Sequence, residues 1–103
     1  MSTVVYMVKA SITPEHEAAF NEWYNTQLCA ELLHFPGVVS ARRYRALMGE
    51  ERHQYIVMYE FENEAAFENF RTSEKRRLLI ERTEARFGAA SERVRSAYVQ
   101  IWP

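Results

Sequence analysis

The spacing of apolar residues changes several times along this chain, and each change marks an expected element of secondary structure. Residues 3–12 are β-branched and aromatic, and both alternating sets of side chains are largely apolar. This pattern predicts a central strand covered on both faces. Apolar residues then recur at helical spacing to about Leu33. Thr13 and Pro14 stand at the N-cap and first position of this helix, and Pro36-Gly37 ends it.

The second half of the chain predicts two strands, two short helices and a last strand. Residues 38–47 and 53–61 are strand-like, and their short polar connection favours an antiparallel hairpin. Asn63 and Ser73 are expected to cap two helices, and residues 94–102 form the last strand. The order β-α-β-β-α-β predicts one ferredoxin-like α+β domain over residues 1–103, a four-stranded antiparallel sheet with its helices on one face.

The second face of such a sheet would have no helix over it. Whatever the register, we expect this face to carry several of six aromatic residues: Tyr6, Tyr44, Tyr55, Tyr59, Tyr98 and Trp102. An exposed apolar patch of that size is uncommon on a monomer. We therefore predict a homodimer, a dimeric α+β barrel in which two sheets pack face to face about a two-fold axis.

Composition limits the classes of partner. The 103 residues include 13 basic and 14 acidic side chains, and the net charge of −1 gives no field that would attract nucleic acid. No apolar run approaches the roughly 20 residues that span a membrane, and the N-terminus lacks the pattern of a signal peptide. The single cysteine, Cys29, fits a reducing compartment. We expect a soluble cytoplasmic domain.

Sequence motifs for metals and nucleotides are missing. Three scattered histidines show no metal-ligand spacing, three glycines form no phosphate loop, and no Gly-x-Ser-x-Gly elbow occurs. If the protein is an enzyme, we therefore expect chemistry without a cofactor, namely acid–base catalysis on a small apolar or aromatic metabolite.

An aromatic helix with Trp23-Tyr24, the Pro36-Gly37 turn and the strand Ser40-Ala41-Arg42-Arg43-Tyr44 resembles the dimeric α+β barrel superfamily, closest to its EthD-like branch. The resemblance covers nearly the whole chain and implies a pocket between the sheet and the first helix of each subunit. Relatives include cofactor-free monooxygenases, polyketide cyclases, muconolactone isomerases and haem-dependent proteins, so function must be argued from the site. EthD-like relatives often carry a helix histidine roughly where Leu28 or Cys29 stands here, and this chain departs from that pattern.

Three residues are candidates for catalysis: Tyr6, Tyr24 and His34. The two phenol hydroxyls could donate hydrogen bonds to a carbonyl or an enolate, or they could be ordinary core aromatics. His34 stands at the expected C-terminus of the first helix, whose dipole favours the charged imidazole. It could transfer a proton at the mouth of a pocket, or it could bond a terminal carbonyl of the helix.

Four residues are expected to contact the substrate: Trp23, Leu28, Arg43 and Tyr98. Arg42 and Arg43 point to opposite faces of their strand. Arg43 could bind a carboxylate through two hydrogen bonds, or it could form a surface ion pair. Trp23 could instead belong to the core or to the dimer interface.

Other reactive side chains are expected to be structural. Cys29 fits a small buried side chain, since no lysine lies near it in the sequence to lower its pKa. His16 and His53 are expected to face solvent. The basic run Lys75-Arg76-Arg77 alternates with glutamates, which predicts a solvated helix face.

Three functions remain open. The leading hypothesis is a small dimeric enzyme that acts by proton transfer on an aromatic or lactone-like metabolite, as an isomerase, a cyclase or a cofactor-independent monooxygenase. The second is a non-catalytic dimer that binds a small molecule or has a structural role, favoured by the missing helix histidine. The third is a haem-binding protein in which His34 would be the axial ligand.

Overall fold

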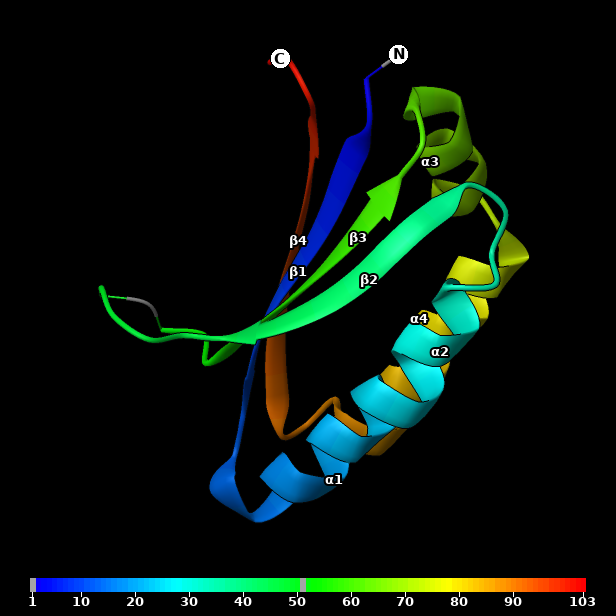
Figure 1. Cartoon of the computed structure of the whole chain (residues 1–103). Helices are drawn as coiled ribbons and strands as arrows, with labels where there is room; N and C mark the ends of the chain where they lie inside the picture. The colour runs from blue at the N-terminus through cyan, green and yellow to red at the C-terminus, as the bar shows by residue number, and fades with distance from the viewer. Residues whose placement is uncertain (1, 51) are drawn as a thin grey trace.

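The computed structural model describes residues 2–50 and 52–103. Four strands form one antiparallel sheet in the order β2-β3-β1-β4 (Figure 1). They are β1 (Val4–Ile12), β2 (Val38–Arg45), β3 (Tyr55–Phe61) and β4 (Ser91–Val99). A first helical region joins β1 to β2, while α3 (Glu64–Arg71) and α4 (Glu74–Phe87) join β3 to β4. This is the predicted β-α-β-β-α-β arrangement.

The first helical region is not the single regular helix that its spacing predicted. It runs through a 3₁₀ turn η1 (Pro14–His16), α1 (Glu17–Trp23), a π-helical segment η2 (Tyr24–Leu28) and α2 (Cys29–Leu32). In η2 the Cys29 amide donates to the carbonyl of Tyr24, five residues back. The Thr26 hydroxyl donates to the Glu22 carbonyl at 2.7 Å, and this side-chain bond competes with the regular backbone pattern.

Caps at the other helices agree with the sequence. The Asn63 side chain accepts from the Ala66 amide at 2.8 Å, and the Ser73 hydroxyl accepts from the Arg76 amide at 3.1 Å. Thr13 is different, because its side chain makes no cap bond to the backbone and instead contacts the Nδ1 atom of His16 at 2.9 Å.

Both helical layers cover the same face of the sheet, and the core lies between them and that face (Figure 1). Along β1, buried and half-buried side chains alternate without interruption. The buried set faces the helices: Val4, Tyr6, Val8, Ala10 and Ile12. The prediction that β1 is covered on both faces is therefore wrong for this chain by itself, since its second apolar set has no helix over it.

The uncovered side of the sheet, which we call the open face, carries fewer aromatic residues than expected. Tyr44 and Tyr98 lie on it and are 48% and 61% exposed. Tyr6, Tyr55 and Tyr59 belong to the helix-covered face, because the register places Tyr6 opposite Tyr59 on the buried set of β1. The open face is completed by aliphatic side chains and methionines: Val5, Met7, Ile56, Met58 and Val94.

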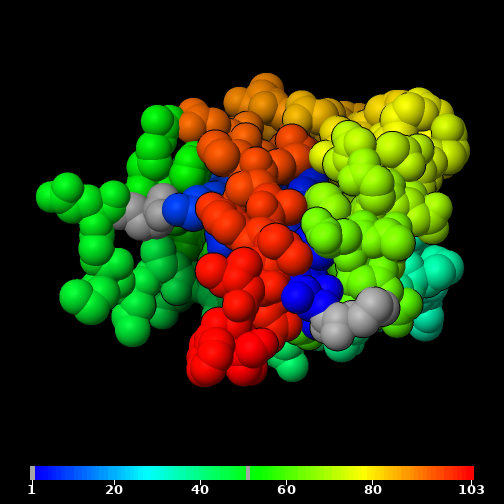
Figure 2. Space-filling model, turned by 90° about the horizontal axis from the view of Figure 1, so that it is seen from above, coloured from blue at the N-terminus to red at the C-terminus, as the bar shows by residue number. Residues whose placement is uncertain are grey.

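The ends of the sheet differ from the prediction by a few residues. β4 begins at Ser91 and ends at Val99, so the exposed Trp102 follows the sheet rather than belonging to it. The end of β4 lies beside the start of β1, as seen from above in Figure 2. Residues 46–50, coloured green, project at the left of that view, and α4, coloured yellow, lies at the right.

His53 is buried, with 7% of its surface exposed, and the prediction that it faces solvent is wrong. Two backbone groups of Ile12 bond the side-chain amide of Gln54 at 2.9 and 3.1 Å, and the Ala46 amide donates to the Gln54 carbonyl at 2.7 Å. These bonds draw the segment before β3 against the sheet and cover the imidazole, which lies 4.0 Å from the carboxylate of Glu92.

Candidate functional site

A narrow cavity lies between the helix-covered face of the sheet and both helical layers. Its empty volume is about 380 Å³, which includes the part open to solvent, and the centre of a water-sized molecule can occupy about 40 Å³ of it. The sheet contributes Tyr6, Val8, Tyr59 and Arg95. The first helical region and the second helical layer contribute Tyr24, Leu28, Leu32, Phe70, Arg76, Leu79, Ile80 and Thr83. Most of this wall is apolar, as in typical small-molecule pockets.

The π-helical segment builds one side of the cavity. Both of its buried residues, Tyr24 and Leu28, line the space. Single π-helical turns inside a helix often mark functional sites. Here the π-helical segment begins at Tyr24, whose phenol is buried in the core.

Tyr6 projects from the centre of β1 into the same space. Its hydroxyl oxygen accepts a hydrogen bond from the Nη2 atom of Arg76 at 3.3 Å, and the guanidinium lies 5.7 Å from the ring centre. The ring also stacks on Tyr59 with centres 5.9 Å apart. Because Arg76 occupies an acceptor site of the phenol oxygen, the hydroxyl proton is left to donate to a bound molecule.

Tyr24 is held as a neutral phenol. Burial raises the pKa of its hydroxyl above the usual 10.0, while the charges of Arg93, Arg95 and Arg43 oppose this increase. The Arg43 guanidinium lies 5.0 Å from the centre of the Tyr24 ring. At neutral pH the Tyr24 side chain is therefore a hydrogen-bond donor in a region of positive potential.

Cys29 and Tyr59 form a second buried pair. Their sulfur and oxygen atoms are 3.9 Å apart. Burial raises the pKa of the Cys29 thiol and holds the pKa of Tyr59 well above its usual range. The thiol is thus kept protonated, and its burial confirms the prediction that Cys29 is a small buried side chain.

The charged residues of the cavity wall are both arginines. Arg76 comes from α4 and is half-buried, while Arg95 comes from β4 and is exposed. Ile80 is the remaining half-buried residue of the wall, so the cavity opens between α4 and β4. Among the described residues that line the cavity, none is an aspartate, a glutamate or a histidine.

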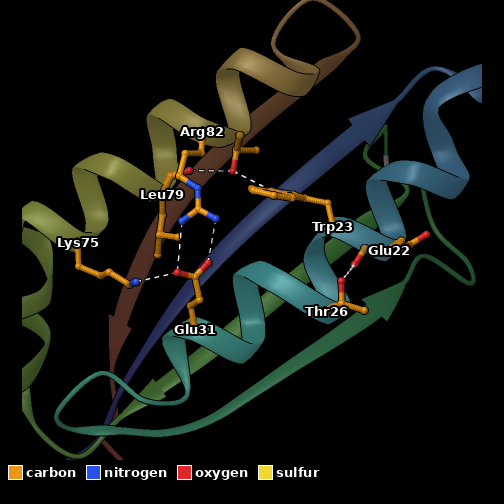
Figure 3. A network of polar contacts seen from close by, with 8 residues as sticks. Glu22, Trp23, Thr26, Glu31, Lys75, Leu79 and Arg82 are labelled. Carbon is orange, nitrogen blue, oxygen red and sulfur yellow. Dashed lines mark hydrogen bonds and ion pairs between the residues drawn. The ribbon is translucent and has the colours of Figure 1, made fainter.

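Polar contacts across the helical layers hold the roof of the cavity together (Figure 3). The Glu31 carboxylate of α2 accepts from Lys75 at 2.7 Å and lies 3.2 Å from Arg82, both on α4. The buried Trp23 indole donates to the Thr83 hydroxyl at 3.2 Å, which in turn donates to a backbone carbonyl of α4. These bonds fix the spacing between the first helical region and α4.

The structure gathers some of the predicted site residues and separates others. Tyr6, Tyr24 and Leu28 line the cavity, and Arg43 stacks on the Tyr24 ring from β2.

The other three predicted residues lie outside the cavity wall. Trp23 is buried behind it and bonded to Thr83, His34 is exposed after α2, and Tyr98 lies on the open face. Their roles in catalysis or binding stay predictions.

The predicted solvated face at residues 75–77 is correct only for Arg77, which pairs with two glutamates of its own helix. Arg76 points into the cavity. A sequence signal for this exists, since Leu79, Ile80 and Thr83 follow Arg76 at helical spacing and share its face.

The sequence gives no such signal for Arg95. Its position depends on pairing with Val8 of β1, which lies 87 residues earlier in the chain.

The described residues contain neither a metal-binding cluster nor a membrane-spanning helix. Within residues 2–50 and 52–103, no group of three His, Cys, Asp or Glu side chains could hold a metal ion. In the same part of the chain, every helix is too short or too polar to cross a membrane.

Solved structures share this fold at low sequence identity. An EthD family protein from Bacillus halodurans has 14% identity and a TM-score of 0.66, with 93% of this chain and 97% of that chain covered. A variant of SnoaB, a cofactor-independent oxygenase from Streptomyces nogalater, has 16% identity and a TM-score of 0.72, with 98% and 95% covered. A dimeric ferredoxin-like protein of unknown function from Jannaschia sp. has 14% identity and a TM-score of 0.69, with 93% and 97% covered.

These similarities confirm the predicted ferredoxin-like fold, which this chain shares with an EthD family protein and with a dimeric ferredoxin-like protein. No curated protein matches the sequence. A family model does match, over residues 3–98, and its description is "domain of unknown function (DUF4286)". This match spans nearly the whole chain, and the protein therefore belongs to the DUF4286 family.

Proposed function

We propose that this protein is a cofactor-free enzyme that binds a small aromatic or lactone-like metabolite in the cavity and acts on it by proton transfer. The reaction would be an isomerisation, a cyclisation or a cofactor-independent oxygenation. One observation carries the proposal: two phenol hydroxyls, those of Tyr6 and Tyr24, line a largely apolar cavity that is bordered by guanidinium groups.

Such an arrangement favours a substrate whose negative charge increases during the reaction. Tyr6 can donate its proton because Arg76 already donates to its oxygen at 3.3 Å, and this charge-assisted contact polarises the phenol. Tyr24 is a second neutral donor. Two donors directed at one oxygen of an enolate or phenolate stabilise it as its charge develops.

The residues that line the cavity also show whether the protein supplies a general base. Because no described residue of the wall is a histidine or a carboxylate, the protein supplies no ordinary general base there. The substrate must therefore carry an acidic C–H or O–H group whose pKa the arginines lower, and its proton would pass to solvent water at the open mouth of the cavity. This requirement suits anthrone-type compounds and lactones with an activated carbon.

The structural neighbours support the same class of chemistry. SnoaB is described as a cofactor-independent oxygenase, and it shares the fold over nearly the full length of both chains. At 16% identity this likeness concerns the fold, so the residues of this cavity must be tested directly.

The enzyme would be a homodimer joined through the open face. Tyr44, Val94 and Tyr98 expose between 48% and 61% of their surface there. Apolar area of this kind gains about 25 cal/mol for each Å² removed from water. The Jannaschia neighbour, described as dimeric, has the same fold. Sedimentation of a stable single subunit at micromolar concentration would contradict this part of the proposal.

Turnover tests the catalytic part. Purified protein without added cofactor is assayed against an anthrone and a muconolactone by absorbance. Because removal of one such donor typically costs about 10²–10³ in kcat, we expect Tyr6→Phe and Tyr24→Phe each to lose at least about tenfold. Tyr44→Phe makes the same chemical change on the open face and should keep full activity.

The opposite outcomes are informative. Full activity in both Tyr6→Phe and Tyr24→Phe would remove these residues from the site. A loss in His34→Ala instead would restore the predicted role of that exposed histidine and place the chemistry outside the cavity.

A non-catalytic binding dimer is the second candidate. The lack of a histidine or carboxylate among the described wall residues favours it. Quenching of Trp23 fluorescence by a substrate that is never converted would support binding without catalysis. The haem-binding alternative has less support, because His34 lies outside the cavity wall and the described wall contains no histidine.

A further inference from the structure

The mouth of the cavity carries positive charge that the protein itself leaves largely uncompensated. Arg76 lies on one side of the mouth, on α4, and Arg95 on the other side, on β4. The Arg76 side chain bonds the uncharged Tyr6 hydroxyl. Among residues 2–50 and 52–103, Arg95 makes no ion pair.

Nearby carboxylates are engaged elsewhere. Glu31 accepts from Lys75 and Arg82 on the roof of the cavity. Glu84 of α4 pairs with Arg93 of β4. Since Arg93 has the same orientation as Arg95 on β4 but already has its own partner, Arg95 is the cation of this strand that is available to a ligand.

The position of these two charges suggests what they bind. A guanidinium at the edge of an apolar cavity interacts strongly with a carboxylate that enters with its apolar part first. Beyond the two arginines, the wall offers aliphatic side chains, among them Val8, Leu28 and Leu79. A ring bearing one carboxylate could contact the arginines with its charge and the aliphatic side chains with its apolar part.

We propose that Arg76 and Arg95 form an anion-binding pair that selects metabolites bearing a carboxylate next to an apolar ring. This inference rests on the proposed function, because it names the substrate class of the same cavity. It differs from the sequence-based prediction for Arg43, whose guanidinium is stacked on Tyr24 and Tyr55 and donates to Asn25.

The test compares benzoate with benzamide, two probes of nearly equal size that differ in charge. Binding is followed by nuclear magnetic resonance titration, observing the methyl groups of Leu28 and Leu79. A charge-assisted hydrogen bond is worth about 1.5–3 kcal/mol, which corresponds to roughly a 10- to 150-fold difference in affinity. We expect benzoate to bind at least about tenfold more tightly than benzamide.

Arg95→Gln is the deciding variant, because Arg95 is exposed and its replacement breaks no ion pair among the described residues. It should weaken benzoate about tenfold and leave benzamide unchanged. Arg77→Gln removes one charge from the same region but lies outside the cavity wall, so it should change neither affinity. Arg76→Gln should resemble Arg95→Gln, and thermal unfolding shows whether the loss of its contact with Tyr6 has harmed the fold.

The possible failures are distinct. Equal affinities for benzoate and benzamide, or an unchanged preference in Arg95→Gln and Arg76→Gln, would overturn the anion-binding pair and leave the proposed function standing. If neither probe shifts the Leu28 and Leu79 methyl groups at millimolar concentration, the cavity does not accept a ring, and both proposals are wrong.

Discussion

Replacement of Gly37 by alanine should destabilise the protein through two separable effects. Gly37 has a φ angle of +89°, a conformation that residues with a side chain rarely adopt. A Cβ atom at this position would also lie 2.5 Å from the Cβ atom of Ala66 in α3. The backbone here is fixed by the sheet, since the Gly37 carbonyl accepts from the Glu62 amide at 2.9 Å.

The size of the effect follows from these two terms. Positive φ in a residue other than glycine costs about 1–3 kcal/mol. A forced contact in a packed region adds about 1–3 kcal/mol, because α3 would have to move away. We therefore expect Gly37→Ala to lower the free energy of unfolding by about 2–6 kcal/mol, a large share of the stability of a domain of this size.

Urea unfolding at fixed protein concentration measures this loss. Gly49→Ala is the matched control, since Gly49 has a φ angle of +94° and nothing lies within 4 Å of its added Cβ. Gly49→Ala should lower the free energy of unfolding only by the cost of the positive φ angle, about 1–3 kcal/mol. The double variant Gly37→Ala/Ala66→Gly removes the contact. Ala66→Gly alone should cost about 1 kcal/mol, as glycine does in a helix, and relative to that cost the double variant should recover the contact term of about 1–3 kcal/mol.

The reasoning fails if Gly37→Ala and Gly49→Ala cost the same. It also fails if Ala66→Gly gives no recovery in the Gly37→Ala background. Either result would mean that α3 does not pack against this turn as closely as the structure indicates.

Two further predictions concern pH and assembly. Burial raises the pKa of Tyr59 and Tyr24 above 10.0, so these phenols ionise in the unfolded chain at a lower pH than in the folded one. The free energy of unfolding should therefore hold below about pH 10 and fall as pH rises further, and Tyr59→Phe should reduce this fall in urea titrations. If the free energy of unfolding of Tyr59→Phe falls with pH as steeply as that of the wild type, this loss of stability arises from other groups. Tyr98→Asp should weaken the proposed dimer about 100-fold or more in sedimentation, because it buries an unpaired charge, while Trp23 fluorescence stays unchanged. An intact Tyr98→Asp dimer would show that the open face is not the interface.

Several features could be predicted from the sequence because they depend on neighbours along the chain. The changes in apolar spacing locate the strands and helices to within a few residues. Asn63 and Ser73 cap their helices as expected, since a cap needs only an amide two or three residues away. Gly37 lies in the turn between α2 and β2 and has a positive φ angle, which glycine adopts at no steric cost.

The residues of the candidate site in the cavity could be predicted only in part. Tyr6, Tyr24 and Leu28 were identified from the faces of their own elements, and the structure brings them together. The predicted aromatic open face was mostly wrong, because a shift of one residue in register moves a side chain to the other face of the sheet.

Only the tertiary structure decided where the charges lie. Arg95 reaches the cavity because β4 pairs with β1, and Arg76 reaches it because α4 packs over Tyr6. His34 lies outside the cavity wall because the chain turns away at the end of α2. The sequence by itself determined the elements, through contacts between residues close along the chain. The cavity and its cationic mouth were decided by contacts between distant elements, which local spacing does not encode.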